Sequence, residues 1–113
     1  MEQPGYKPRT REFLLKECRR LQNLLQLRDW HIDLLTGDTM PENEDYDNPA
    51  QVVYYLAVLR AVIRIDQTKC KEQDLDPLHA LYHEFAHILL AYCTYEERMC
   101  NILADIMYQN RRK

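Results

Sequence analysis

Glycine is scarce in this sequence, with two residues in 113, and no apolar run in it is long. A collagen-like chain needs glycine at every third position, so that class is excluded. A membrane-spanning helix needs about 20 consecutive apolar residues, and no run comes near that length. Apolar residues still make up 46% of the chain and charged residues 29%, the balance of ordinary folded proteins. We therefore expect one soluble domain over residues 1–113.

An excess of positive charge is also missing. Fifteen Lys and Arg residues stand against eighteen Asp and Glu residues, giving a formal net charge of −3. The chain as a whole then has no field that would attract a nucleic-acid backbone or an anionic membrane. Neither is an expected partner, although the basic residues near the start leave a nucleic-acid-associated regulator as the least favoured function.

Cysteine pairs and a secretory signal are absent as well. No Cys-x-x-Cys occurs, and the first residues lack the basic and apolar regions of a signal peptide. Reduced thiols that serve as small packing residues are typical of cytosolic proteins. We predict a cytoplasmic protein in which the cysteines have that packing role: Cys18, Cys70, Cys93 and Cys100.

Periodicity divides the first half of the chain. Apolar residues at three- and four-residue spacing predict an amphipathic helix over 9–27, with Thr10 as its N-cap. Partial alternation predicts a strand over 30–35, and the polar residues 36–48 predict a surface loop. Residues 51–66 are rich in Val, Ile and Tyr and predict two strands joined around 56–59, rather than a helix that begins at Pro49.

The second half predicts helices. Residues 67–75 are expected to form a loop. Asp76-Pro77 is an N-cap followed by proline at the first helical position, so a helix should run from there to about Cys93. Thr94 is the expected N-cap of a last helix that extends towards Gln109. The fold class is therefore α+β: one helix, a small three-stranded sheet and two C-terminal helices.

A metal-site motif lies in the first of these C-terminal helices, in the segment His83-Glu84-Phe85-Ala86-His87. Residues four apart lie on one face of a helix, so His83 and His87 can hold one ion while Glu84 sits beside it. Zinc in catalytic sites keeps a position for water, and a neighbouring carboxylate can take the proton of that water. The motif therefore predicts a Zn²⁺ cofactor with Glu84 as the general base.

Two exposed histidines could also share a helix face by chance. The apolar stripe of the same helix lies nearly opposite them and comprises Leu78, Leu81, Phe85, Ile88, Leu89 and Tyr92. Small residues lie beside the histidines, where a solvated face would more often carry Lys or Glu: Ala80, Ala86 and Ala91. This favours a face that another element approaches, and hence the metal site. His79 is expected to be a neighbour rather than a ligand.

A third ligand has to come from another element, and Glu97 of the last helix fits. Glu97 shares a face with Asn101, Ala104 and Tyr108, away from that helix's apolar side of Met99, Ile102, Leu103 and Ile106. A rival structural role remains open, because Thr94-x-x-Glu97 also fits a capping box. Asn101 could orient a metal ligand or be an ordinary exposed residue.

These residues resemble the gluzincin metallopeptidases, whose His-Glu-x-x-His motif is followed by Glu-x-x-x-Asn-x-x-Ala. Here the second part is Glu97 to Ala104, and the short gap after His87 resembles the minimal single-domain members, the minigluzincins of phages and bacteria. The resemblance implies a zincin-like fold in which His83, His87 and Glu97 bind zinc. It implies that Glu84 activates a zinc-bound water to hydrolyse peptide bonds.

The resemblance also implies a peptide or protein substrate that pairs with an edge strand over the zinc helix, here Ala61–Asp66. An ordinary edge strand is equally compatible with the pattern. The family's transition-state donor has four candidates: His79, Tyr82, Tyr92 and Tyr95. Because a second subdomain is missing, the alternative is a catalytically weak or inactive zinc-binding module that holds peptides. Substrate and oligomeric state are not encoded in these patterns.

Overall fold

The computed structural model describes residues 5–36, 48–91 and 96–111, and the side chains of residues 96–99 lie outside this description. The helices are α1 (Arg11–Leu24), α2 (Gln67–Glu72), α3 (Pro77–Leu89) and α4 (Glu96–Asn110). The strands are β1 (His31–Thr36), β2 (Ala50–Tyr55) and β3 (Arg60–Ile65). The predicted α+β class is confirmed. None of the helices within these ranges has the length and apolar content needed to cross a membrane.

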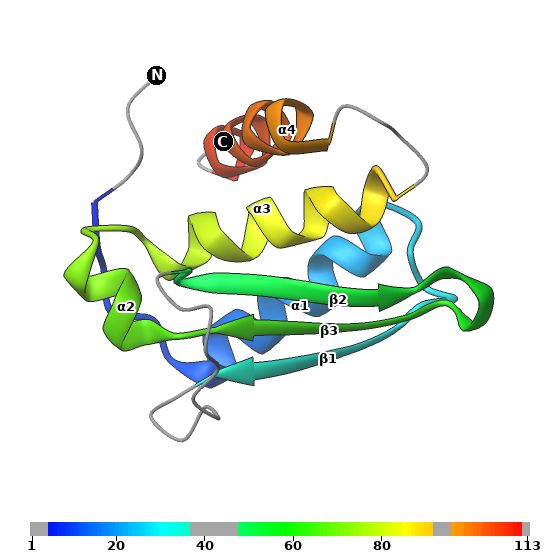
Figure 1. Ribbon diagram of the computed structural model, residues 1–113, viewed down its shortest axis with the longest axis horizontal. Coiled ribbons are helices and arrows are strands. Elements are labelled where there is room, and N and C mark those ends of the chain that lie inside the picture. The colour runs from blue at the N-terminus through cyan, green and yellow to red at the C-terminus, as the bar shows by residue number, and fades with distance from the viewer. Residues whose placement is uncertain (1–4, 37–47, 92–95, 112–113) are drawn as a thin grey trace.

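The three strands form one sheet in the order β1-β3-β2. β2 and β3 are antiparallel and joined through a 3-10 turn at Leu56–Val58, which confirms the predicted connection. Leu59 closes it in the left-handed region, with φ of 50°. β1 pairs in parallel with the other side of β3. Figure 1 shows the three strands side by side, with β3 in the middle.

The prediction that Ala61–Asp66 is an edge strand is therefore wrong, because its residues up to Ile65 form the central strand β3. Ala61, Ile63 and Ile65 are fully buried. Alternation reports which face of a strand is buried, but it does not report how many neighbours the strand has. Among the described strands, β1 and β2 are the edges.

Helix α1 begins where its cap predicts, because Thr10 Oγ1 accepts a hydrogen bond from the Phe13 amide at 3.1 Å. The predicted loop at 67–75 is wrong in its first part, which forms α2. The Asp66 carboxylate caps this short helix by accepting from the Lys69 amide at 3.1 Å, and Cys70 anchors it in the core. Six residues are too few to show a helical period in the sequence.

Helix α3 starts at Pro77 with Asp76 as its cap, as predicted. Asp76 is fully buried, and its carboxylate accepts from the Leu78 amide at 2.9 Å, from Arg9 at 3.0 and 2.7 Å and from the Tyr108 hydroxyl at 2.8 Å. Burial alone would raise the pKa of Asp76, but these hydrogen bonds outweigh it and hold the pKa below its ordinary value. α3 ends at Leu89, earlier than predicted, and Cys93 and Thr94 lie outside the described residues.

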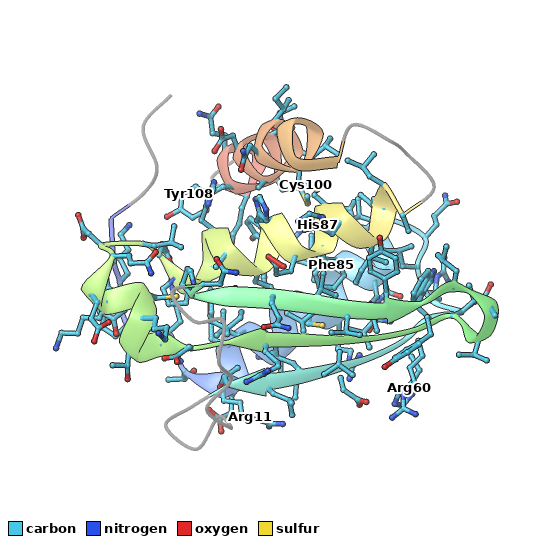
Figure 2. The ribbon with its side chains drawn as sticks, viewed as in Figure 1. Arg11, Arg60, Phe85, His87, Cys100 and Tyr108 are labelled. Carbon is cyan, nitrogen blue, oxygen red and sulfur yellow. The ribbon has the colours of Figure 1, made fainter. Side chains whose placement is uncertain are left out.

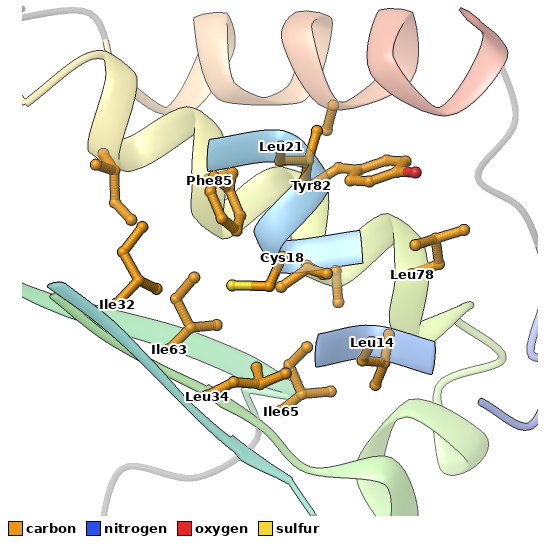
Figure 3. Packing of buried hydrophobic residues seen from close by; sticks show 14 of the residues in the cluster. Leu14, Cys18, Leu21, Ile32, Leu34, Ile63, Ile65, Leu78, Tyr82 and Phe85 are labelled. Carbon is orange, nitrogen blue, oxygen red and sulfur yellow. The ribbon is translucent and has the colours of Figure 1, made fainter. Parts of the chain in front are cut away.

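The core lies between the sheet and the pair α1 and α3, and α4 covers α3 on the side away from the sheet (Figure 1). Figure 3 shows that side chains of α1, the sheet and α3 meet in this core. They include Leu14, Cys18 and Leu21 of α1, Ile32 and Ile63 of the sheet, and Tyr82 and Phe85 of α3. α3 is thus packed between two layers, so any group on its remaining open face is held by a rigid scaffold.

Candidate metal centre

Helix α3 brings His83, Glu84 and His87 together. The potential ligand atoms of these three residues all lie within 4.8 Å of one another. The two imidazole rings have their centroids 4.9 Å apart at an interplanar angle of 71°. His83 and His87 are half-buried, while Glu84 is 5% exposed. The group follows from helix geometry, because residues four apart share a face.

Nitrogen donors at this spacing suit zinc. Since zinc lies about 2 Å from each imidazole nitrogen, two nitrogens on one ion are at most about 4 Å apart. The limit of 4.8 Å observed for the group requires only a small side-chain adjustment to reach that geometry. Other divalent ions accept the same donors, so the arrangement fits a transition metal more firmly than it fits zinc in particular.

The group opens into a cavity of about 600 Å³. His79, His83, Glu84 and His87 line it from α3, Gln51, Val52 and Tyr54 from β2, and Asn101 from α4. β2 therefore forms the wall facing the histidines, in the position that the sequence analysis gave to Ala61–Asp66. Neither Lys nor Arg is among the described residues that line this cavity.

Most of the predicted apolar stripe of α3 is buried, as expected. Leu78, Leu81, Phe85 and Ile88 have at most 3% exposure. On the histidine side, Ala80 and Ala86 are buried as well, at 4% and 0%. Small residues there allow β2 and α4 to pack close to α3, so the half-buried histidines lie at the wall of an open cavity.

Helix α4 runs antiparallel to α3 and packs against it (Figure 1). Cys100, Ala104 and Tyr108 are buried, and Figure 2 shows Cys100 and Tyr108 on the side of α4 nearest α3. Ile102 and Ile106, which are 43% and 47% exposed, point the other way. Of the face that the sequence analysis assigned to Glu97, Ala104 and Tyr108 are therefore buried.

The backbone of Glu97 lies in the first turn of α4, one turn before Asn101. Its side chain is outside the described part of the structure, and so is Thr94. The ligand role of Glu97 and the alternative capping box therefore both stay predictions. Asn101 borders the same cavity as His83 and His87 and is exposed, so both of its predicted roles stay open.

His79 has a partner of its own. Its Nε2 lies 2.8 Å from Asp105 Oδ1 of α4, and its ring meets the edge of Tyr108 at a centroid distance of 5.8 Å. His79 is 3% exposed and borders the cavity, but it is not part of the close group formed by His83, Glu84 and His87. This agrees with the prediction that His79 is a neighbour of the site.

Tyr82 is not placed to act in the cavity. It is fully buried, and its hydroxyl donates to Glu17 of α1. Burial, together with the nearby Glu17 carboxylate, raises the pKa of Tyr82. Tyr92 and Tyr95 lie outside the described residues. Tyr54 of β2, which the sequence analysis missed, does border the cavity; its two-residue spacing from Val52 is the signal that both share a face of the strand.

Comparison with known proteins adds no relative. No family model, no curated protein and no solved structure matched this chain. The resemblance to the minigluzincins therefore rests on the motif residues themselves and remains a prediction.

Proposed function

We propose that this protein is a zinc-dependent peptidase, with the reaction centred on His83, Glu84 and His87. The observation that carries the proposal is the meeting of these three side chains on one helix face, at the wall of a cavity. A surface pair of histidines would lack both the buried carboxylate and the enclosing strand.

The proposed metal ligands are His83 and His87, with Glu97 as the third. A bound zinc ion would supply a Lewis acid that polarises a carbonyl and lowers the pKa of water. Glu84, 5% exposed at the same wall, is the group positioned to take a proton from an attacking water. The same carboxyl group can then give that proton to the departing amine.

The proposed substrate is an extended peptide that lies along β2. Among the described strands, β2 pairs only with β3, and its residues form the wall of the cavity opposite the histidines. An extended segment beside an edge strand gains backbone hydrogen bonds without a dedicated pocket. This replaces Ala61–Asp66 as the proposed substrate strand, because β3 already has two neighbours.

A cytoplasmic location is also proposed. Cys18, Cys70 and Cys100 are fully buried, as predicted for packing residues. Burial raises the pKa of Cys18 to about 11 and that of Cys70 to about 12, so both thiols stay protonated and unreactive. Cysteines used in this way suit a reducing compartment.

The first test is the metal content of the purified protein and of His87→Ala. We expect about one zinc per chain in the wild type and loss of zinc in the variant, because three protein ligands are normal for a catalytic site. His31→Ala is the matched control, since the His31 side chain is 71% exposed on β1. Wild-type protein that takes up no zinc when zinc is offered would refute the metal site.

The second test is hydrolysis of an unfolded protein by the wild type and by Glu84→Gln. Loss of the general base should lower the rate by at least about 100-fold while zinc remains bound. Equal rates in the two proteins would exclude Glu84 as the base. Stoichiometric zinc with no turnover in the wild type would instead favour a zinc-binding module that holds peptides.

A further inference from the structure

Tyr108 and Asp105 of α4 both make polar contacts with α3 or with its cap residue. At one end the Tyr108 hydroxyl donates to Asp76 Oδ2 at 2.8 Å. Closer to the candidate metal centre, His79 Nε2 and Asp105 Oδ1 are 2.8 Å apart, with side-chain exposures of 4% and 25%. The first contact joins α4 to the cap of α3, and the second joins the two helices within their length.

The His79–Asp105 contact fixes which residues of the two helices face one another. From His79, four-residue steps along α3 lead to His83 and then His87. From Asp105, equal steps back along the antiparallel α4 lead to Asn101 and then to position 97. Each step advances about 6 Å on either helix, so the two series stay in phase. Asn101 does border the same cavity as His83 and His87, as this register requires.

We infer that His79 and Asp105 form a positioning clamp for the metal site, which sets the register of α4 so that its first turns complete the ligands offered by α3. The inference rests on the proposed function, because it assumes that the site binds a zinc-like ion. Neither residue touches the ion in this arrangement. Their role is to place residues that do.

The packing around the clamp explains why a directional contact is needed. On the side of α4 towards the metal centre the buried residues are the small Cys100 and Ala104, which would tolerate a shift or rotation of the helix, whereas the larger Tyr108 packs on the far side of the clamp. A hydrogen bond has a preferred distance and angle, whereas apolar contact has neither. Because His79 is almost fully buried, a register that separated it from Asp105 would leave a polar ring without compensation.

A positioning role and a purely structural role predict different measurements. If the pair only stabilises the fold, variants that still fold should bind metal as the wild type does. If the pair sets the register, folded variants should bind metal more weakly and with altered coordination. Zinc affinity by chelator competition and the visible spectrum of bound Co²⁺ report on these two properties without requiring activity.

The experiment compares full-length wild type with His79→Leu, His79→Gln, Asp105→Ala and Tyr108→Phe. His79→Leu and Asp105→Ala should lose zinc affinity by about 10-fold to 100-fold and change the Co²⁺ spectrum, as loss of supporting contacts does at metal sites. His79→Gln should restore much of the affinity, because its amide nitrogen can donate to Asp105 from nearly the same place. Tyr108→Phe, the matched control, should keep the affinity within about twofold.

The inference is overturned if Asp105→Ala binds zinc as tightly as the wild type with the same Co²⁺ spectrum. It is equally overturned if Tyr108→Phe loses as much affinity as Asp105→Ala, since the effect would then be general. If His79→Leu does not fold, Asp105→Ala decides, because Asp105 is partly exposed. Failure of the wild type to bind zinc would refute the proposed function itself, whereas normal zinc binding in every clamp variant refutes only the clamp.

Discussion

Three carboxylates are buried among the residues whose side chains the structure describes, and they differ in what surrounds them. Asp76 has Arg9 against it, and Glu17 has Arg20 and Arg111 within 2.5 and 3.3 Å. Glu84 is as buried as Glu17, at 5% against 6%, yet its cavity is lined by histidines and by neither Lys nor Arg among the described residues.

The difference lies in the groups beside each carboxylate: arginines at Asp76 and Glu17, and histidines at Glu84. A buried carboxylate is normally neutralised by a fixed cation or by a metal ion. The arginines stabilise Asp76 and Glu17 permanently, so these residues tie α1, α3 and α4 together. Beside Glu84 the structure places the imidazoles of His83 and His87, whose nitrogen lone pairs can bind a metal. These are the donors that the proposed metal site would use.

The largest effect is expected from replacing Asp76, a buried carboxylate that pairs with an arginine. Asp76→Ala should lower the free energy of unfolding by roughly 3–5 kcal/mol, because it leaves Arg9 without its partner and removes the cap of α3. Urea unfolding of the metal-free protein measures this. Glu84→Ala is the comparison and should lower the free energy of unfolding less, because Glu84 lies within α3 and does not cap it. Equal losses in the two variants would erase the distinction between the two acids.

The second largest effect is expected from zinc, which should stabilise the folded protein by binding at the proposed site of His83 and His87. At a free zinc concentration 100 times the dissociation constant, binding to the folded state alone adds about 2.7 kcal/mol. The melting temperature of the wild type should rise accordingly, and that of His87→Ala should not. His31→Ala should respond like the wild type, because His31 is a surface residue. A similar rise in His87→Ala would place the zinc elsewhere.

Low pH should weaken the ion pairs that Asp76 and Glu17 form with arginines. The pKa values of Asp76 and Glu17 are lowered in the fold: burial would raise both, but hydrogen bonds from Arg9 and from Arg20 outweigh it. The unfolded state thus binds more protons, so the stability is present above the ordinary carboxyl pKa of about 4 and is lost as the pH falls through the lower folded values. Asp76→Asn should show a shallower loss in urea titrations below about pH 4; an unchanged slope would contradict this role.

The smallest effect is expected from removing one of the hydrogen bonds that Glu17 accepts. Tyr82→Phe removes the hydroxyl that donates to Glu17 but leaves Arg20 and Arg111 in place. The cost in unfolding free energy should be about 1 kcal/mol. Zinc affinity should not change, because Tyr82 does not border the cavity. A drop in affinity would show that the α1 contact reaches the metal centre.

Several features were predictable because their signals are local. Thr10 and Asp76-Pro77 mark helix starts within a few residues, and a spacing of four puts His83 and His87 on one face whatever surrounds the helix. Alternation in β3 reports correctly which residues face the core. Each of these depends on the geometry of one element, which a sequence window contains in full.

Other features required the whole structure. The sequence pattern of Ala61–Asp66 fits an edge strand and a central strand equally well. Only the pairing with β1, about 30 residues away, shows that this strand is central. As a result, β2 and not β3 lines the cavity. α2 is shorter than the period that would reveal it. Partners of these buried groups lie far away in the sequence: Arg9 for Asp76, Tyr82 and Arg111 for Glu17, and Asp105 for His79.

The sequence by itself determined that two histidines and a glutamate lie together on α3, since side-chain identity and helical spacing are local properties. Tertiary structure decided which other elements surround these three side chains. Strand order, the antiparallel docking of α4 and the contact between His79 and Asp105 arise from packing between distant segments of similar composition. Their relative energies depend on all the contacts made together, so no single stretch of the chain encodes them.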